Sequence, residues 1–230
     1  MPDPRTTTPA PMIDDISLER LRSADPSLVS DCMMRLGLHG WMDSVRPVQP
    51  GPRRMAGRAR TLLFGPKRGD GAWATSMYRT IASLSPGDAL VFATGGTPQN
   101  LMGDNMALQG QLCGLAAMIT DSTVRDTAGM QELTMPVFAR GPAVRLPMMM
   151  EPVALDVPVV CGGAQVRPGD ALVGCEDGVV VVPAARIADV LFELEDAEAC
   201  ERELKQAITA RAPLETIEAI LKRKKAPRAR

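Results

Sequence analysis

The sequence contains only one histidine, His39, and this limits the available chemistry more than any other count. A single histidine cannot build a multi-histidine metal centre, and it leaves one position for the base of a Ser-His or Cys-His pair. His39 lies in the stretch RLGLHGWM, which is typical of a helix end followed by a glycine turn. We therefore expect His39 to have a structural role and not a catalytic one.

The sequence also lacks any CxxC pair, which argues against a zinc site of that kind. Its five cysteines are odd in number, widely spaced and mostly flanked by apolar residues, a pattern that favours reduced, buried thiols over disulfides. They are Cys32, Cys113, Cys161, Cys175 and Cys200.

Long hydrophobic runs are absent as well. No stretch approaches the roughly 18 to 20 apolar residues that span a bilayer, and residues 1–15 lack the apolar core of a secretion signal. The formal net charge of −1 provides no overall field that would attract nucleic acid or an acidic membrane. We expect a cytoplasmic protein with no membrane partner, whose ligand is recognised at a local site.

The 230 residues, 45% of them hydrophobic, suffice for one sizeable domain with a buried core. Residues 1–16 hold four prolines and three consecutive threonines, which predicts a flexible arm. Residues 17–212 form the predicted main domain, and residues 213–230 a C-terminal helix and basic tail. The tail has six Lys and Arg but no aromatic residue to stack on bases, so we expect it to be solvated, with nucleic acid not a partner.

Apolar periodicity within the main domain predicts an α/β fold, in which helices surround a compact β-layer. Helices are expected at 17–38 (two short ones), 72–84, from about 103–106 onward, and over 184–225 with a break at Pro213. Strands are expected within 51–65, at 89–94, 115–120 and 136–141, and in a hairpin over 168–183 that turns at Glu176-Asp177-Gly178. The hexapeptide PGDALV occurs at 86–91 and 168–173, and we interpret it as a reused turn that starts a strand.

Two segments concentrate polar residues among apolar ones: MGDNMALQG at 102–110 and TDSTVRDTAG at 120–129. Asp104 and Asp126 are 22 residues apart. A helix of about 10 residues followed by a strand of about 6 would return the chain to the same edge of a sheet. Ligands bind at such edges in open α/β folds, so the two segments are predicted to share a site.

The residue types in these segments suit a small 2-oxo acid bound together with a metal. Asp126 offers a hard oxygen ligand for Mg²⁺ or Mn²⁺, and Arg125 offers a planar, two-pronged donor for a carboxylate or an enolate. The backbone amides of residues 103–106, at a helix N-terminus, can hold a substrate anion. The alternative is structural: Asp126 caps the following helix, and Arg125 lies on the surface.

Three blocks in order resemble the RraA-like family, which includes 4-hydroxy-4-methyl-2-oxoglutarate aldolases and regulators of ribonuclease E activity. They are Gly-Asp before a helix, RD before PVFARG, and RPGD followed by DGVVVVP. The resemblance covers roughly residues 25–200. It implies a swivelling β/β/α-type domain with C-terminal helices, assembled as a homotrimer or homohexamer with sites near the subunit interfaces.

In the aldolase branch of the family, the resemblance assigns substrate binding to Arg125 and metal binding to Asp126. The family's substrate loop falls on Gly103, Asp104, Asn105 and Met106, and its acid that orders water beside the metal falls on Asp104. The implied function is class II, Mg²⁺- or Mn²⁺-dependent cleavage that releases pyruvate, with oxaloacetate decarboxylation at the same site.

Three points stay open at the level of the sequence. One is an alternative function, a non-catalytic regulator that binds a ribonuclease or another protein. Another is the identity of a glutamate that family aldolases take from a neighbouring subunit, for which the candidates are Glu193, Glu195, Glu198 and Glu201. The third is Ser122, which stands where the family usually has glycine and either narrows the loop or fills space.

Overall fold

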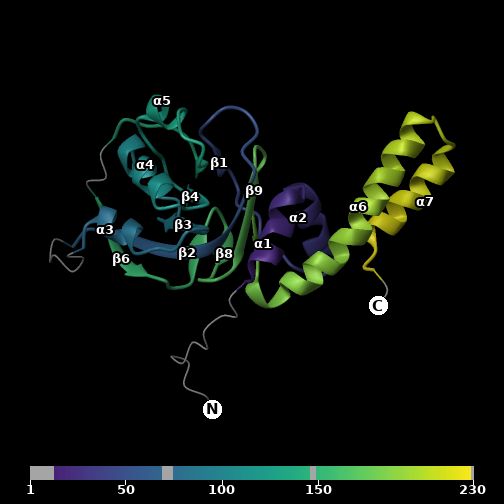
Figure 1. Ribbon diagram of the computed structural model, residues 1–230, viewed down its shortest axis with the longest axis horizontal. Helices are drawn as coiled ribbons and strands as arrows, with labels where there is room; N and C mark the ends of the chain where they lie inside the picture. The colour runs from purple at the N-terminus through teal and green to yellow at the C-terminus, as the bar shows by residue number, and fades with distance from the viewer. Residues whose placement is uncertain (1–12, 69–74, 146–148, 229–230) are drawn as a thin grey trace, which may run out of the picture.

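The computed structural model describes residues 13–68, 75–145 and 149–228 (Figure 1). The predicted flexible arm over 1–16 lies outside these residues except for its last four. Of those four, Ile13 is buried, and helix α1 (Asp15–Ser23) begins two residues before the predicted start at 17. The Asp14 side chain accepts a hydrogen bond of 2.7 Å from the Ser17 amide and so caps this helix.

One mixed sheet of eight strands forms a nearly closed barrel. The strand order is β1-β5-β4-β3-β2-β9-β10, β6 also pairs with β2, and β1 contacts β10 across the opening. These strands are β1 (Arg46–Pro47), β2 (Met55–Pro66), β3 (Asp88–Ala93), β4 (Ala117–Thr120), β5 (Val137–Ala139), β6 (Met150–Leu155), β9 (Ala171–Cys175) and β10 (Gly178–Val182). A separate hairpin, β7 (Val159–Cys161) with β8 (Ala164–Val166), contributes side chains to the barrel interior. The sequence did not predict β1, β6, β7 or β8.

Strands β2 to β5 are parallel, and helices cover their outer face. The crossovers carry α3 (Met77–Ala82), α4 (Asp104–Leu112) and α5 (Thr127–Met130). All six residues of β3 are buried, as in a strand covered on both faces: Leu90 and Phe92 pack beneath the helices, and Ala89 and Val91 face the barrel interior. The carboxyl ends of β3 and β4 therefore lie at the edge where α4 and α5 begin.

The repeated PGDALV segment forms the same turn at both of its positions. Gly87 and Gly169 have φ values of 83° and 88°, which glycine adopts without a Cβ clash. Asp88 accepts a hydrogen bond from the Ser85 amide, and Asp170 accepts one from the Arg167 amide. In each turn, the aspartate side chain therefore accepts from the backbone amide three residues earlier in the chain. The turns lead into β3 and β9, which confirms the predicted turn that starts a strand.

Four helical segments lie on the other side of the barrel: α1, α2 (Pro26–Arg35), a short 3₁₀ turn η1 (Ala184–Arg186) and the long α6 (Ile187–Thr209). The first two helices and α6 bury a cluster of apolar side chains against β9 and β10. Helix α7 (Leu214–Lys225) follows Pro213, as predicted, and folds back along α6 to form a hairpin that projects away from the barrel (Figure 1). Within the described residues, no helix combines the length and the apolar character needed to cross a membrane.

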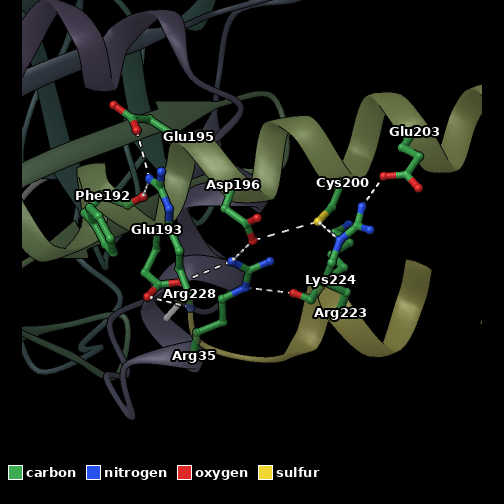
Figure 2. Close-up of polar contacts among 10 residues, drawn as sticks. All are labelled: Arg35, Phe192, Glu193, Glu195, Asp196, Cys200, Glu203, Arg223, Lys224 and Arg228. Carbon is green, nitrogen blue, oxygen red and sulfur yellow. Dashed lines mark hydrogen bonds and ion pairs between the residues drawn. The ribbon is translucent and has the colours of Figure 1, made fainter. Parts of the chain in front are cut away.

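The prediction of a solvated basic tail is wrong for Lys224 and Arg228, whereas Lys222 and Lys225 are exposed as expected. The Arg228 backbone amide donates to both carboxylate oxygens of Glu193, at 3.1 and 3.0 Å, and its guanidinium lies over the Phe192 ring, 4.2 Å from the centroid (Figure 2). Lys224 bonds Glu201 at 2.7 Å. The sequence pattern shows the cations of the tail but not the acidic face of α6 that receives them.

The tail contacts surround a buried arginine, Arg35 of α2. Its side chain is 2% exposed, and Nη1 lies 3.1 Å from Glu193 and 3.0 Å from Asp196 (Figure 2). Nε donates to the Lys224 carbonyl at 2.7 Å. Because a buried charge is costly without partners, these contacts fix α2, α6 and the end of α7 in one arrangement.

All five cysteines are free thiols and four of them are buried, as the sequence predicted. Burial raises the pKa of the Cys32 thiol to about 12. Burial also holds the pKa of the Cys161 thiol well above its ordinary value. These two thiols therefore remain protonated at neutral pH and have little nucleophilic character.

Candidate functional site

The loops that follow β3 and β4 run side by side at the carboxyl edge of the sheet. The Thr123 amide donates to the Gln99 carbonyl at 3.3 Å, the Leu101 amide to the Thr123 carbonyl at 3.2 Å, and the Arg125 amide to the Met102 carbonyl at 3.1 Å. These bonds form a short parallel ladder outside the named strands. The ladder places Arg125 beside the start of α4.

Asp121 stabilises the start of this ladder through hydrogen bonds, a role that the sequence did not reveal. Its side chain is 2% exposed and accepts hydrogen bonds from the Thr94 amide (2.9 Å), the Thr94 hydroxyl (2.9 Å) and the Gly96 amide (2.8 Å). A buried carboxylate with three donors joins the end of β4 firmly to the loop after β3. We assign Asp121 a positioning role, because it does not line the cavity described below.

Ser122 connects the same two loops. Its hydroxyl lies within donating distance of the Thr97 carbonyl (2.7 Å) and the Gln99 carbonyl (2.5 Å), and it accepts a hydrogen bond from the Gln99 amide (2.7 Å). The residue is 1% exposed. The serine therefore holds the loop through hydrogen bonds, which neither of the two sequence-based interpretations included.

Replacing Ser122 with alanine should lower the free energy of unfolding by about 1–3 kcal/mol, because the Gln99 amide loses a buried acceptor. The value is measured by urea unfolding of the variant and the wild type. Ser122→Gly, the residue usual in the family, is the comparison variant and should lose at least as much. An unchanged unfolding midpoint in both variants would contradict this role.

Asp126 has an unusual backbone conformation, with φ 58° and ψ 37° in the left-handed region. Aspartate tolerates this region better than most residues, but at an energetic cost that is often found at functional sites. Its side chain makes no capping hydrogen bond to α5 and is 45% exposed. The geometry therefore contradicts the structural alternative, in which Asp126 caps the helix.

The carboxylate of Asp126 lies between Arg125 and Gly103. Arg125 Nε is 3.3 Å from Asp126 Oδ2. A Cβ added to Gly103 would stand 2.5 Å from the same oxygen, so the absence of a side chain at the N-cap of α4 makes room for the carboxylate. The site thus brings together the two segments that are 22 residues apart in the sequence.

A second glycine makes room for the carboxylate of Asp104. It is the first residue of α4, and its Oδ1 accepts a hydrogen bond of 2.7 Å from the Asn105 amide. A Cβ added to Gly129 of α5 would stand 2.4 Å from Asp104 Oδ2. Two glycines therefore allow the two carboxylates to approach the starts of α4 and α5, where backbone amides favour negative charge.

Adding a methyl group at Gly103 should displace the Asp126 carboxylate. We expect Gly103→Ala to lower any activity of the site about 10- to 100-fold, since displacements near 1 Å cost this much in positioned sites. The backbone of Gly103 is extended, at φ −119° and ψ −176°, so alanine adds no backbone strain. Thermal unfolding should therefore stay close to wild type, and an unchanged catalytic rate would refute the proposed packing.

A cavity of about 310 Å³ opens at this edge. All six residues that the sequence assigned to the site line it: Gly103, Asp104, Asn105, Met106, Arg125 and Asp126. Four further residues line it that the sequence did not single out: Tyr78, Asn100, Leu101 and Met102. Tyr78 is the single tyrosine of the chain. No pattern in the local sequence indicates that α3, which carries Tyr78, reaches the cavity. His39 is not among the lining residues and instead contacts the Trp41 ring edge to face.

The carboxylates of the cavity fit a hydrated Mg²⁺ or Mn²⁺. Across the described residues, no group of three or more His, Cys, Asp and Glu side chains is arranged to hold a metal ion, so a zinc-type cage is not formed within this part of the chain. Mg²⁺ commonly takes one or two protein carboxylates and completes its octahedron with water and substrate oxygens. Asp126, with Asp104 nearby, provides such a donor set.

The four glutamates that were candidates for an acid or base do not line this cavity. Each of them forms an ion pair with a cation of α1, α2, α7 or the tail: Glu193 with Arg35, Glu195 with Arg228, Glu198 with Arg20, and Glu201 with Lys224. Helix α6, which carries them, lies on the far side of the barrel from α4 and α5 (Figure 1). None of the four can serve the cavity of its own chain.

Comparison with known proteins gives consistent matches. The RraA-like family model, described as Aldolase/RraA, matches residues 26–181, a span that includes the whole cavity edge from β3 to α5. A protein of Halalkalibacterium halodurans is 29% identical over 193 residues, covering 84% of this chain and 88% of its own, and its name assigns it provisionally as a 4-hydroxy-4-methyl-2-oxoglutarate aldolase. A Thermus thermophilus protein named 4-hydroxy-4-methyl-2-oxoglutarate aldolase is 27% identical over 135 residues, or 58% of this chain and 78% of its own.

The solved structures include Streptomyces coelicolor RraAS2, described as an unusual member of the RNase ES inhibitor RraA protein family. It superposes with a TM-score of 0.77 at 27% identity, and the match covers 84% of this chain and 98% of that one. The barrel and its helices are therefore those of RraA proteins.

Proposed function

The chain belongs to the RraA-like family, and from this premise we propose that it is a divalent-metal-dependent, class II aldolase that cleaves a 4-hydroxy-2-oxo acid and releases pyruvate. The observation that carries the proposal is the meeting of Arg125 and Asp126 with the N-terminus of α4, made possible by Gly103. A binding surface alone does not require this arrangement of a cation, a carboxylate on a left-handed backbone and a helix N-terminus. The compound in the relatives' names, 4-hydroxy-4-methyl-2-oxoglutarate, belongs to this substrate class.

The substrate's 2-oxo acid end occupies the polar side of the cavity. The Arg125 guanidinium donates to the substrate carboxylate. Backbone amides of residues 103–106 add donors at the helix N-terminus, apart from the Asn105 amide, which bonds Asp104. Asp126 would hold the metal at this end of the cavity. When bound, Mg²⁺ or Mn²⁺ acts as a Lewis acid that draws electron density from the 2-oxo group.

The reaction breaks the bond between C3 and C4 of the substrate. The C4 hydroxyl loses its proton, C4 becomes the carbonyl carbon of the departing aldehyde or ketone, and the bonding electron pair moves to C3 as an enolate. Arg125 offsets the negative charge that develops on the pyruvyl oxygens. Asp104 orders the water that takes up the hydroxyl proton, and protonation of C3 yields pyruvate.

The same groups would support decarboxylation of oxaloacetate. Loss of carbon dioxide from C4 of that acid leaves the same three-carbon enolate, so Arg125 stabilises the same developing charge. We therefore propose oxaloacetate decarboxylase activity as a second reaction of the site. Both reactions end in pyruvate, which a single coupled assay measures.

We further propose that the protein is cytoplasmic and assembles as a homotrimer or homohexamer. Such an assembly provides a route by which a glutamate of one copy can reach the cavity of another, since the α6 glutamates do not reach their own cavity. Light scattering during gel filtration measures the mass of the assembly. A monomer that turns over substrate would remove the need for a neighbouring residue.

The test of function compares two outcomes. Purified protein with Mg²⁺ or Mn²⁺ should release pyruvate from oxaloacetate and from at least one 4-hydroxy-2-oxo acid. The resemblance of the fold to RraAS2 makes a non-catalytic regulator the alternative. Stoichiometric capture of a purified ribonuclease E-type enzyme, together with no pyruvate from either class of acid, would support the regulator and refute the aldolase.

A further inference from the structure

One residue of the cavity wall, Asn100, connects three loops at the carboxyl edge of the sheet. Asn100 lies in the loop after β3 and lines the cavity, yet the residue is 2% exposed. A polar side chain that is buried this deeply is stable when its amide group finds hydrogen-bond partners. The partners of Asn100 therefore show what the residue does.

Two partners orient the side-chain amide of Asn100. Its Nδ2 donates to the Ala143 carbonyl, and its Oδ1 accepts a hydrogen bond of 2.7 Å from the Thr123 hydroxyl. A backbone carbonyl can only accept, so the Ala143 contact fixes which end of the amide carries the NH₂ group. The side chain therefore has one orientation, in which it bonds two other loops.

The three bonded residues belong to the loops that follow β3, β4 and β5. The middle loop is also bonded to the loop after β5 through its backbone: the Val124 carbonyl accepts a hydrogen bond of 2.8 Å from the Ala143 amide. Asn100 adds a side-chain bond to the middle loop at Thr123 and another to the loop after β5 at Ala143. It thus fixes the middle loop two residues before Arg125.

The loop determines where the Arg125 guanidinium lies. The Arg125 side chain is 45% exposed, and its ion pair of 3.3 Å joins it to Asp126, the next residue in the chain. An ion pair between adjacent residues moves together with the loop and does not hold the loop in place. The Arg125 backbone, in contrast, is bonded to the loop after β3 through the Met102 carbonyl, at 3.1 Å. The contacts of the loop, including those of Asn100, therefore set the position of the guanidinium.

From these contacts we propose that Asn100 is a positioning residue, which acts through Thr123 and Ala143 to place the Arg125 guanidinium for the substrate. The inference rests on the proposed aldolase function and adds a residue to it. It applies equally to a 4-hydroxy-2-oxo acid and to oxaloacetate, because both reactions place the same pyruvyl unit against Arg125. Since small displacements of a positioned group are costly, loss of Asn100 should lower the rate even in a folded protein.

Two substitutions remove the contacts of Asn100 in different ways, and a third keeps them. Asn100→Ala removes both hydrogen bonds and should lower kcat/KM for oxaloacetate and for 4-hydroxy-2-oxopentanoate about 10- to 100-fold, the cost of a displacement near 1 Å. Thr123 does not line the cavity, and Thr123→Val removes one of the two bonds, so kcat/KM should fall about 2- to 10-fold. Thr123→Ser keeps the hydroxyl and should retain wild-type kinetics.

A double-mutant cycle separates the positioning of Arg125 from a general loss of structure. In an Arg125→Lys background, the added Asn100→Ala substitution should lower kcat/KM by less than about threefold, because the guanidinium that Asn100 positions is already absent. If the two losses instead multiply in the double variant, Asn100 acts independently of Arg125 and the inference is wrong. If Asn100→Ala does not fold, Thr123→Val takes its place in the cycle, with the same expectation.

Hydrogen exchange of the backbone amides gives a readout that does not depend on turnover. Asn100→Ala should speed exchange of the Arg125 and Ala143 amides at least about tenfold relative to the wild type and to Thr123→Ser, since their loops lose a bonded partner. Unchanged exchange, or wild-type kcat/KM in a folded Asn100→Ala protein, would overturn the inference and leave the aldolase function intact. If the wild type released pyruvate from neither acid, the aldolase function itself would fall, and the inference with it.

Discussion

Asp126→Asn should abolish metal-dependent turnover, with a loss in kcat/KM of at least about 10³-fold, or roughly 4 kcal/mol of transition-state stabilisation. Asparagine keeps the shape of the side chain and tolerates the left-handed backbone of this position, at φ 58°. It removes the negative charge that the metal requires, so the loss should reflect metal binding and not misfolding. The measurement is pyruvate release at saturating Mn²⁺, together with Mn²⁺ binding by electron paramagnetic resonance.

An exposed acidic residue near α5, the helix that follows Asp126, serves as the matched control. Glu132 follows α5 closely, but it does not line the cavity, so Glu132→Gln should keep wild-type kinetics and Mn²⁺ affinity. Full activity of Asp126→Asn at the Mn²⁺ concentration that saturates the wild type would show that the metal ligand lies elsewhere.

Arg125→Lys should lose about 10²- to 10³-fold in kcat/KM, the range seen when one donor to a developing oxyanion is removed. Lysine keeps the positive charge but not the planar pair of N–H donors that matches a carboxylate. Arg125 Nε also lies 3.3 Å from Asp126 Oδ2. Because lysine keeps a positive charge beside this carboxylate, the substitution should weaken Mn²⁺ binding only modestly. Steady-state kinetics with oxaloacetate gives kcat and KM separately, and both should change.

The control for charge-preserving substitution is Arg79→Lys, at an exposed arginine of α3 outside the cavity. It should match the wild type in kcat and KM. If Arg125→Lys behaved in the same way, Arg125 would be a surface residue, as the structural alternative in the sequence suggested.

The central part of the fold was predictable because its signals are local. Buried apolar runs mark β3, β4 and β5, the Asp-Gly pair marks the turn between β9 and β10, and Pro213 separates α6 from α7. The position of the site also followed from local rules, since a helix and then a strand between Asp104 and Asp126 return the chain to one edge. The parallel pairing of β3 with β4 confirms that expectation.

What escaped prediction depends on contacts between distant segments. Strand β1 has only two residues and is defined by its partner β5, and β6 exists because the long β2 has a free edge beyond β9. Arg228 has an ordered position because α6 presents Glu193 and Phe192 to it. Tyr78 reaches the cavity because α3 packs on α4, and no sequence pattern indicates that contact.

Ser122 and Asp121 illustrate the same limit within the site itself. The sequence places both at the end of a strand among polar residues. Only the structure shows that they bond the loop after β3, through Gln99 and Thr94 respectively. The residue types of Arg125 and Asp126 were enough to propose a chemistry for them, but the scaffold that positions them was not visible in the sequence.

The central claim, a metal-dependent lyase built on Asp126, is tested most directly by removing and restoring the metal. Wild-type protein is treated with EDTA, dialysed, and assayed for pyruvate release from oxaloacetate and 4-hydroxy-2-oxopentanoate before and after Mn²⁺ is added, with Asp126→Asn in parallel. We predict that the wild type loses its activity in EDTA and regains it with Mn²⁺, and that Asp126→Asn stays inactive throughout. Wild-type turnover that persists without metal, or equal recovery of the variant, would contradict the account.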